Sequence, residues 1–367
     1  MLALVKVGWN ENTCTERIEE ALADALGTAA FDVIYTEAAL EARCAAQQGK
    51  QGNIVLFALV LPKGGMSLAY IRLISWLTGH PQCLRGWSGA VIVDGPSELF
   101  TKKIGRELIF IANQAGCAFP GKPLVEATGS LYNFSTQARL QGVDKLQAYK
   151  NSAAALVQKT AAFAACRQRG LPKEAPPRRL RILVLHASSR KTSNTLLLWE
   201  LIRQAMGSRV ETTEISLRNG AVVDCRGCSY EACLHFGEQE DCFYGGVMVD
   251  KVYPAVGWCD AIMLICPNYN DAVSANIMAF FNRLTALFRK DVSAFSQKKI
   301  YALVVSGYSG GDLVAEQVLD AMTCNKNFIL PPYFALIETA NDPQSIMQRP
   351  GIRERAAAMA ERIVENN

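Results

Sequence analysis

The sequence has 367 residues, of which half are hydrophobic and a fifth are charged, a balance that excludes a disordered chain or a low-complexity fibre. The 38 basic and 34 acidic side chains leave a net charge of only +4, which is too balanced to argue for a nucleic-acid partner by itself. No apolar run approaches the roughly 18 residues of a membrane span, because the best candidate, residues 54–61, stops at Pro62.

The N-terminus opens directly into the apolar run 2–7, with no basic region before it and no small-residue cleavage site after it. A first strand is therefore expected there, and not a signal peptide. In a protein without a secretion signal, twelve cysteines indicate a reducing cytoplasm, where clustered thiols usually serve metal or redox chemistry. At roughly 150 residues per domain, the length predicts two domains.

The chain has one clear break, in the proline-rich stretch 171–179. Three prolines within six residues cannot continue a helix or enter a sheet interior, so this stretch reads as a linker. Residues 141–168 before it carry apolar side chains at helical spacing. We therefore expect a first domain over 1–140, a helix and linker over 141–179, and a second domain over 180–367.

Both halves alternate apolar strands with helical patterns. Strands are predicted at 2–7, 31–35, 53–60, 88–93 and 123–127 in the first half, and at 180–186, 210–216, 261–266, 300–305 and 333–337 in the second. Helices are predicted at 15–26 and 101–115, and then at 194–206, 247–257, 272–289, 312–323 and 351–365. Continuous apolar strands that alternate with helices indicate a parallel sheet covered on both faces, so we predict two α/β domains of the flavodoxin-like, doubly wound type.

The two halves also resemble each other in sequence. An ungapped alignment of residue 89 with residue 301 places identical residues together: Ala90 and Ala302, Val93 and Val305, Gly95 and Gly307, Ser97 and Ser309, Pro120 and Pro332, Glu126 and Glu338. With the shared order of elements, these identities predict an internal duplication.

The start of the second half carries the strongest local signal for a ligand. A strand ends at His186, and a loop of hydroxyls, an amide, an arginine and a lysine (187–195) leads into a helix. Backbone N–H groups and the helix dipole make such a helix N-terminus an anion site. The alternative is that Ser193, Asn194 and Thr195 only cap the helix. Because capping needs one polar residue and this loop has many, anion binding is the stronger interpretation.

Two further loops follow predicted strands of the same sheet. The first contains Pro267, Asn268, Tyr269 and Asn270, and the second is the glycine-rich stretch 306–312. A doubly wound sheet binds its ligands at the carboxyl ends of its strands, so all three loops should converge on one site. Tyr269 offers a flat aromatic surface there, and the glycines allow close backbone approach to a planar ligand.

Taken in order, these loops resemble the NAD(P)H-dependent FMN reductases, a flavodoxin-like family that includes the iron–sulfur flavoproteins. The resemblance rests on Ser188-x-Arg190-Lys191-x-x-Asn194-Thr195, on Cys225-x-Gly227-Cys228, on Pro267-x-Tyr269 and on the stretch 306–311, and it covers residues 180 to about 340. It implies an FMN site with the following residues. Ser188, Arg190, Ser193, Asn194 and Thr195 would hold the phosphate, while Pro267, Asn268, Tyr269, Asn270, Ser306, Gly307 and Gly310 would surround the isoalloxazine ring.

Four cysteines follow the second strand of this half. Cys225, Cys228, Cys233 and Cys242 have the spacing C-x₂-C-x₄-C-x₈-C on what we expect to be a loop. Four thiolates so close in sequence can ligate one [4Fe–4S] cluster or one zinc ion. The iron–sulfur flavoproteins have a tighter spacing, so a cluster, a zinc ion and free thiols beside the flavin all stay open.

The first half lacks the corresponding phosphate chemistry. Its loop after the first strand, 8–15, has an acidic residue, Glu11, and no arginine or lysine. A carboxylate there would repel a phosphate dianion. We therefore expect a degenerate copy without cofactor, and we hypothesise that it covers the flavin of the second copy as a neighbouring subunit does in dimeric relatives.

The sequence thus predicts an FMN-dependent oxidoreductase that passes a hydride from NAD(P)H to FMN and then to a flavin, quinone, metal ion or protein acceptor. No catalytic side chain is expected, because the flavin itself accepts the hydride. The main alternative is an electron-transfer iron–sulfur flavoprotein that a partner protein reduces, without nicotinamide turnover. A third alternative is a scaffold protein that a zinc ion stabilises and that binds no ligand. Small-molecule or protein electron carriers are the expected partners, in a monomer or a homodimer, with no nucleic acid or membrane.

Overall fold

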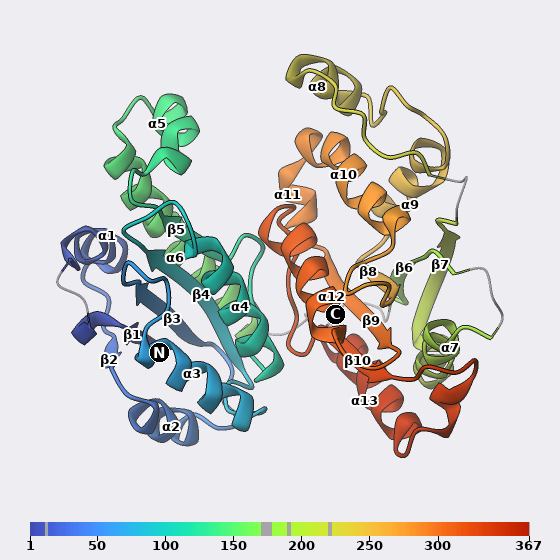
Figure 1. Ribbon diagram of the computed structural model, residues 1–367, viewed down its shortest axis with the longest axis horizontal. Helices are drawn as coiled ribbons and strands as arrows, with labels where there is room; N and C mark the ends of the chain where they lie inside the picture. Colours follow the sequence, from blue (N-terminus) through green and yellow to red (C-terminus); the bar gives the residue numbers. More distant parts are fainter. Residues whose placement is uncertain (12–13, 170–177, 189–191, 219–221, 367) are drawn as a thin grey trace. The chain divides into compact units, whose positions relative to one another are not determined.

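The computed structural model describes residues 1–11, 14–169, 178–188, 192–218 and 222–366. The chain divides into two compact units, Met1–Glu174 and Ala175–Asn367, and each is built around one five-stranded parallel sheet (Figure 1). Residues 170–177, which hold most of the predicted linker, lie outside the described residues. Each unit is therefore considered by itself.

The first unit has the strand order β2-β1-β3-β4-β5, the doubly wound order of flavodoxin. Its strands are β1 (Leu2–Val7), β2 (Asp32–Ile34), β3 (Asn53–Val60), β4 (Trp87–Asp94) and β5 (Leu124–Ala127). Its helices are α1 (Glu16–Leu26), α2 (Glu37–Ala46), α3 (Leu68–Gly79), α4 (Thr101–Gln114), α5 (Ser135–Gln141) and α6 (Lys145–Arg169). Every residue of β4 is buried, as its continuous apolar sequence requires of a strand covered on both faces.

The long helix α6 belongs to the first unit. It packs beside α1 on one face of the sheet, where Tyr149 and Leu156 enter the core together with Ile18 of α1. Helix α3 contacts both α2 and α4. The sequence places α6 with the linker, but its buried stripe makes it part of the first hydrophobic core.

The second unit repeats this order, as β7-β6-β8-β9-β10. Its strands are β6 (Leu180–His186), β7 (Val210–Ser216), β8 (Ala261–Pro267), β9 (Lys299–Ser306) and β10 (Ala335–Thr339). Its helices are α7 (Asn194–Met206), α8 (Tyr230–Glu238), α9 (Tyr253–Trp258), α10 (Ala275–Lys290), α11 (Val292–Phe295), α12 (Gly311–Leu319) and α13 (Ile352–Glu365). The two sheets confirm the predicted fold class.

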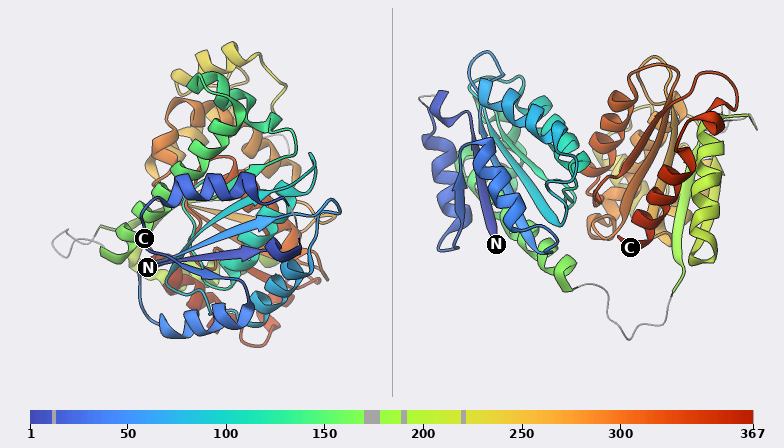
Figure 2. Two further views of the ribbon diagram at one scale, coloured as in Figure 1. Left: turned by 90° about the vertical axis from the view of Figure 1, so that its left-hand side faces the viewer. Right: turned by 90° about the horizontal axis from the view of Figure 1, so that it is seen from below.

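Helices α7 and α13 pack together on one face of the second sheet, around Trp199 and Met359 (Figure 2). Helix α12 contacts β9 and β10, and α8 packs on α10. Within the described residues, no helix has both the length and the apolar character that crossing a bilayer requires. The helices cover the two faces of the sheet and not its carboxyl edge, where the loops that follow β6, β8, β9 and β10 lie.

The pairing register supports the predicted duplication. In the first sheet Val93 of β4 pairs with Glu126 of β5, and in the second sheet Val305 of β9 pairs with Glu338 of β10. The ungapped alignment matches these two pairs residue for residue. Equal strand order and equal register at one strand pair are what two copies of one ancestral unit would retain.

Two of the differences from the sequence prediction concern β10 and the cysteine segment of the second unit. Strand β10 begins at Ala335, two residues late, because Tyr333 has a φ of 55° and cannot lie in an extended strand. The cysteine segment, expected to be all loop, contains helix α8. Ser229 begins this helix by accepting a hydrogen bond from the N–H of Ala232 at 3.2 Å, and Cys233 therefore lies on a helix.

Candidate functional site

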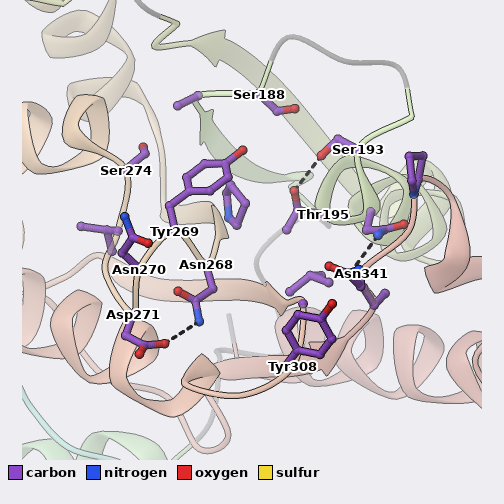
Figure 3. Close-up of a pocket in the computed structure, with 18 of the residues that line it drawn as sticks. Ser188, Ser193, Thr195, Asn268, Tyr269, Asn270, Asp271, Ser274, Tyr308 and Asn341 are labelled. Carbon is purple, nitrogen blue, oxygen red and sulfur yellow. Dashed lines mark hydrogen bonds between the residues drawn. The ribbon is translucent and has the colours of Figure 1, made fainter.

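A cavity of about 980 Å³ opens at the carboxyl edge of the second sheet (Figure 3). It is formed by the loops after β6, β8, β9 and β10, where a doubly wound fold places its ligands. The predicted site residues that line it are Ser188, Ser193, Asn194, Thr195, Pro267, Asn268, Tyr269, Asn270 and Gly307. The structure therefore brings residues from three predicted loops into one cavity of cofactor size.

Three predicted residues lie elsewhere or are not described. Ser306 is the last residue of β9 and Gly310 lies in the loop after it, and neither is among the cavity-lining residues. Arg190 lies outside the described residues. Ser306 and Gly310 nevertheless contact the lining loops directly, so their contribution to the site is structural support.

At one end of the cavity, helix α7 presents its N-terminus. Ser193 precedes the helix, but its side chain makes no capping bond to the helix backbone. Its hydroxyl instead lies 2.9 Å from the hydroxyl of Thr195. The interpretation that Ser193 merely caps the helix is therefore wrong. The first-turn N–H groups that every helix leaves without an intrahelical acceptor remain available to an anion.

Asn194, the first residue of α7, uses its side chain to hold a neighbouring loop. Its amide nitrogen donates to the carbonyl oxygens of Ala340 and Asp342, at 3.0 and 2.9 Å. Its amide oxygen accepts from the backbone N–H of Ile346 at 3.2 Å. The side chain thus fixes the loop after β10 beside the N-terminus of α7, and what Asn194 can offer an anion is its backbone N–H.

The loop after β8 is a two-residue turn at Asn270 and Asp271. Both residues are left-handed, with φ of 54° and 56°, and Tyr269 and Ala272 exchange backbone hydrogen bonds across the turn at 3.4 and 3.2 Å. Two successive left-handed residues form a type I′ turn, for which Asn and Asp are well suited. This turn leaves the Tyr269 ring 60% exposed, as a flat surface at the cavity.

Asn268 joins the loops after β8 and β9. Its amide nitrogen lies 3.1 Å from a carboxylate oxygen of Asp271, 3.2 Å from the hydroxyl of Ser306 and 2.8 Å from the carbonyl oxygen of Ser309. Its own amide oxygen is buried and has no hydrogen-bond partner. The hydroxyl of Ser274, also in the cavity lining, is buried and unpartnered as well.

These orphaned atoms test whether a flavin fits the cavity. A buried polar atom without a partner is costly, so a donor or acceptor supplied by a ligand would stabilise the site. The uracil-like edge of an isoalloxazine ring carries both kinds of group, and its phosphate requires the N–H groups of a helix such as α7. The residues present therefore fit FMN.

Sequence reasoning missed the loop after β10. Ala340, Asn341 and Pro343 line the cavity, although none was expected to contribute. The rule that ligands bind at the carboxyl ends of strands could have found them, because this loop follows the fifth strand of the same sheet. Tyr308, 81% exposed in the predicted loop 306–312, is a second aromatic residue in the lining beside Tyr269, although it was not singled out.

His186 lies at the end of β6 and contacts the phosphate loop. Its Nδ1 is 3.1 Å from the carbonyl oxygen of Ser188. Burial lowers its pKa, which favours a neutral ring that donates from Nδ1 to this carbonyl. The half-buried imidazole thus supports the loop backbone.

A second, smaller cavity of about 370 Å³ is lined by the cysteine segment and by α10. All four predicted ligands, Cys225, Cys228, Cys233 and Cys242, are in its wall. Among the described residues, however, no three Cys, His, Asp or Glu groups stand close enough together to hold a metal ion. The four thiols therefore share the wall of one cavity but do not meet at one point.

Four thiols in the wall of one cavity are the donor set of either candidate centre. Four Zn–S bonds of about 2.3 Å would bring the sulfurs to within roughly 4 Å of one another. A [4Fe–4S] cluster is larger and separates its four thiolates by its own width. By donor type, the four cysteines fit an iron–sulfur cluster or a zinc ion.

The carboxyl edge of the first unit is occupied by the unit's own side chains. Arg17 of α1 forms an ion pair with the mostly buried Asp94 at the end of β4, with N–O distances of 2.5 and 2.9 Å. The carboxylate of Glu11 accepts from the N–H groups of Leu68 and Ala69, at the start of α3, at 3.0 and 2.9 Å. The carboxylate of the loop after β1 thus occupies the N-terminus of α3, which follows the third strand of the chain and corresponds to α10 of the second unit.

Comparison with known proteins agrees with the sequence resemblance. Residues 180–342 match the family model of the NADPH-dependent FMN reductases. An iron–sulfur flavoprotein of Archaeoglobus fulgidus is 27% identical over 143 residues, which are 38% of this chain and 69% of that protein.

Solved structures match about half of the chain. An NAD(P)H:quinone oxidoreductase from Methanothermobacter marburgensis is 15% identical with a TM-score of 0.37, over 52% of this chain and 99% of its own. An FMN-dependent NADH-azoreductase from Bacillus anthracis, in complex with FMN, is 10% identical with a TM-score of 0.37, over 50% and 99%. The fold assignment itself rests on strand order and register. The family match confirms the predicted resemblance: residues 180–342 are similar to the NADPH-dependent FMN reductases and lie on a sheet with the flavodoxin strand order, and this similarity indicates an FMN-binding oxidoreductase in this half.

Proposed function

We propose that the second unit binds one FMN in the cavity at its carboxyl edge and uses it to pass a hydride from NAD(P)H to an acceptor. The observation that carries this proposal is the cavity itself. It combines an uncapped helix N-terminus, two exposed tyrosines and buried polar atoms without partners. The acceptor would be a flavin, a quinone, a metal ion or a protein, in a reducing cytoplasm.

The phosphate end of the site would be the start of α7. Ser188, Ser193 and Thr195 bring hydroxyls to this end of the cavity, and the helix dipole adds partial positive charge. We assign the phosphate counter-charge to Arg190, which follows the family pattern. No side chain needs to act as an acid or base at this end, because its task is to hold an anion.

The ring end would be the turn after β8 and the loop after β9. Tyr269 supplies a surface for stacking, and the buried amide oxygen of Asn268 can accept a hydrogen bond from the ring edge. When bound, FMN would supply the hydride-accepting group, and the protein positions it and leaves one face open to the nicotinamide.

The first unit would then bind no flavin of its own. Its loop after β1 carries the carboxylate of Glu11, which would repel a phosphate, and the Arg17–Asp94 ion pair lies at the same edge of the sheet. Fluorescence titration with FMN tests the assignment. Arg190→Glu should abolish all flavin binding, and flavin retained by that variant would show that a second site exists.

A second candidate function follows from helix α10. Ala275 and Asn276, at its start, line the flavin cavity, and Asn282, Arg283 and Ala286 line the cysteine cavity. One rigid helix therefore joins the two sites. If Cys225, Cys228, Cys233 and Cys242 hold a [4Fe–4S] cluster, the chain could transfer electrons between a partner protein and the flavin without nicotinamide.

One experiment separates the two functions. NADPH is added without air to protein whose FMN, iron and zinc have been counted. Rapid loss of flavin absorbance supports the reductase. Inertness to NADPH, with reduction by a ferredoxin, supports the electron carrier, and a protein that binds zinc but neither iron nor flavin refutes both.

A further inference from the structure

Arg283 is a buried cation in the wall of the cysteine cavity. It lies on α10 and is 2% exposed. Its guanidinium donates to the carbonyl oxygens of Gly245 and Val223, at 2.6 and 3.3 Å. Its Nε is buried without a hydrogen-bond partner, and no carboxylate of the described residues forms an ion pair with it.

Such an arrangement is unfavourable unless an anion completes it. Two carbonyl oxygens satisfy hydrogen bonds but do not neutralise the charge, and an uncompensated buried cation costs several kcal/mol, on the order of the desolvation penalty for one ion. The four thiols share the cavity wall with Arg283. An anionic group held by these thiols would be the missing partner.

We propose that Arg283 tunes the reduction potential of an iron–sulfur cluster held by the four cysteines, an inference that rests on the cluster proposed above. A [4Fe–4S] centre with four thiolates is an anion, and its negative charge increases by one when it accepts an electron. A fixed positive charge nearby stabilises the reduced form more than the oxidised form. Arg283 would therefore raise the reduction potential of the cluster and favour its reduction by an electron donor.

The same helix runs from the flavin cavity to the cysteine cavity. Arg283 in the cysteine cavity is seven positions after Asn276 in the flavin cavity, which at 1.5 Å per residue is about 10 Å along the axis of α10. One electron could pass from the reduced cluster to the flavin over such a span, which restores the oxidised cluster and leaves the electron on the flavin. In this arrangement Arg283 sets how readily the cluster gives the electron up.

Two variants separate charge from shape. Arg283→Gln removes the charge but keeps N–H donors, while Arg283→Lys keeps the charge but loses the planar fork. Arg203, which pairs only with Glu200 on the exposed face of α7, provides the control variant Arg203→Gln. Each full-length protein is prepared without air, its iron and FMN are counted, and the cluster potential is measured by mediated titration with EPR detection.

We expect Arg283→Gln to lower the equilibrium constant for cluster reduction at least tenfold, which is about 59 mV for a one-electron couple. Arg283→Lys and Arg203→Gln should stay near the wild-type potential. An unchanged potential in Arg283→Gln, or equal shifts in the Gln and Lys variants, would overturn the proposal.

The iron content of the variants also distinguishes a role of the Arg283 charge from a purely structural role. If Arg283→Gln binds FMN but no iron, the lysine variant decides: iron at the wild-type potential supports the role of charge, and loss of iron in both variants shows a purely structural role. Wild-type protein that binds FMN but no iron would refute the cluster and this inference, and leave the FMN reductase proposal standing.

Discussion

The amide nitrogen of Asn268 donates to the carbonyl oxygen of Ser309 at 2.8 Å, and this bond ties the loop after β8 to the loop after β9. The same side chain reaches Asp271 and Ser306, so one amide holds both walls of the ring end of the cavity. The geometry of the proposed isoalloxazine site therefore depends on one residue that is itself only partly satisfied.

Asn268→Ala should weaken FMN binding strongly. It removes these bonds and the acceptor proposed for the ring edge, and each buried hydrogen bond lost costs roughly 1–3 kcal/mol. We expect FMN affinity to fall by about tenfold or more, since 1.4 kcal/mol corresponds to a factor of ten. Fluorescence titration measures it, with Asn151→Ala on the exposed surface of α6 as the control. Wild-type affinity in Asn268→Ala would contradict the assigned ring end.

Gly310→Ala should disrupt the same loops from the other side. Gly310 is left-handed, with a φ of 77°, and a Cβ there would overlap the carboxylate of Asp271. Gly207→Ala is a matched control, because Gly207 also has positive φ, at 58°, but has open space around its Cβ position. Both variants should lose about 1 kcal/mol of stability from backbone strain, measured by urea denaturation. Only Gly310→Ala should also lose FMN affinity, and an equal effect of both on FMN would contradict this account.

Gly237→Ala should affect the cysteine cavity alone. A Cβ at Gly237 would overlap the backbone carbonyl of Ala286, so this glycine lets α8, which carries Cys233, lie close against α10. We expect the variant to lose iron while it keeps FMN, as measured by metal analysis and flavin content. The control is Gly257→Ala on α9, where a Cβ meets no atom within 4 Å. Full iron content in Gly237→Ala would show that the docking of α8 does not control the metal site.

His186 should make the second unit less stable as the pH falls. Burial lowers its pKa in the folded protein below the unfolded value of about 6.5, so the unfolded chain binds more protons in this range. The stability that the neutral ring contributes is present above about pH 6.5 and is lost as the pH falls toward the folded pKa. Denaturant titrations across this range should show a shallower decline in His186→Gln, and an identical pH dependence in the variant would contradict the assignment.

The positions of the strands could be predicted because each core strand is an uninterrupted apolar run. The predicted start of β10 was wrong, because Tyr333 lies in a turn with a left-handed backbone. The hydrophobic pattern of the sequence does not reveal such a backbone conformation. The site was predictable to the level of loops, because strand ends of one sheet must meet at one edge.

The roles of single side chains within those loops were less accessible to sequence reasoning. Asn194 looks like a phosphate ligand in sequence, but its amide bonds Ala340 and Asp342, residues almost 150 positions away. Arg283 was not expected to be buried, because a helix sequence shows a charged residue without showing what packs over it. Both depend on tertiary contacts that no local pattern encodes.

The central claim is that the second unit of this chain holds a single FMN. Equilibrium titration of FMN into the full-length protein, followed by flavin fluorescence, tests it most directly. This account predicts saturable binding of one FMN per chain, which Arg190→Glu abolishes. Absence of binding, or a stoichiometry of two FMN per chain, would contradict it.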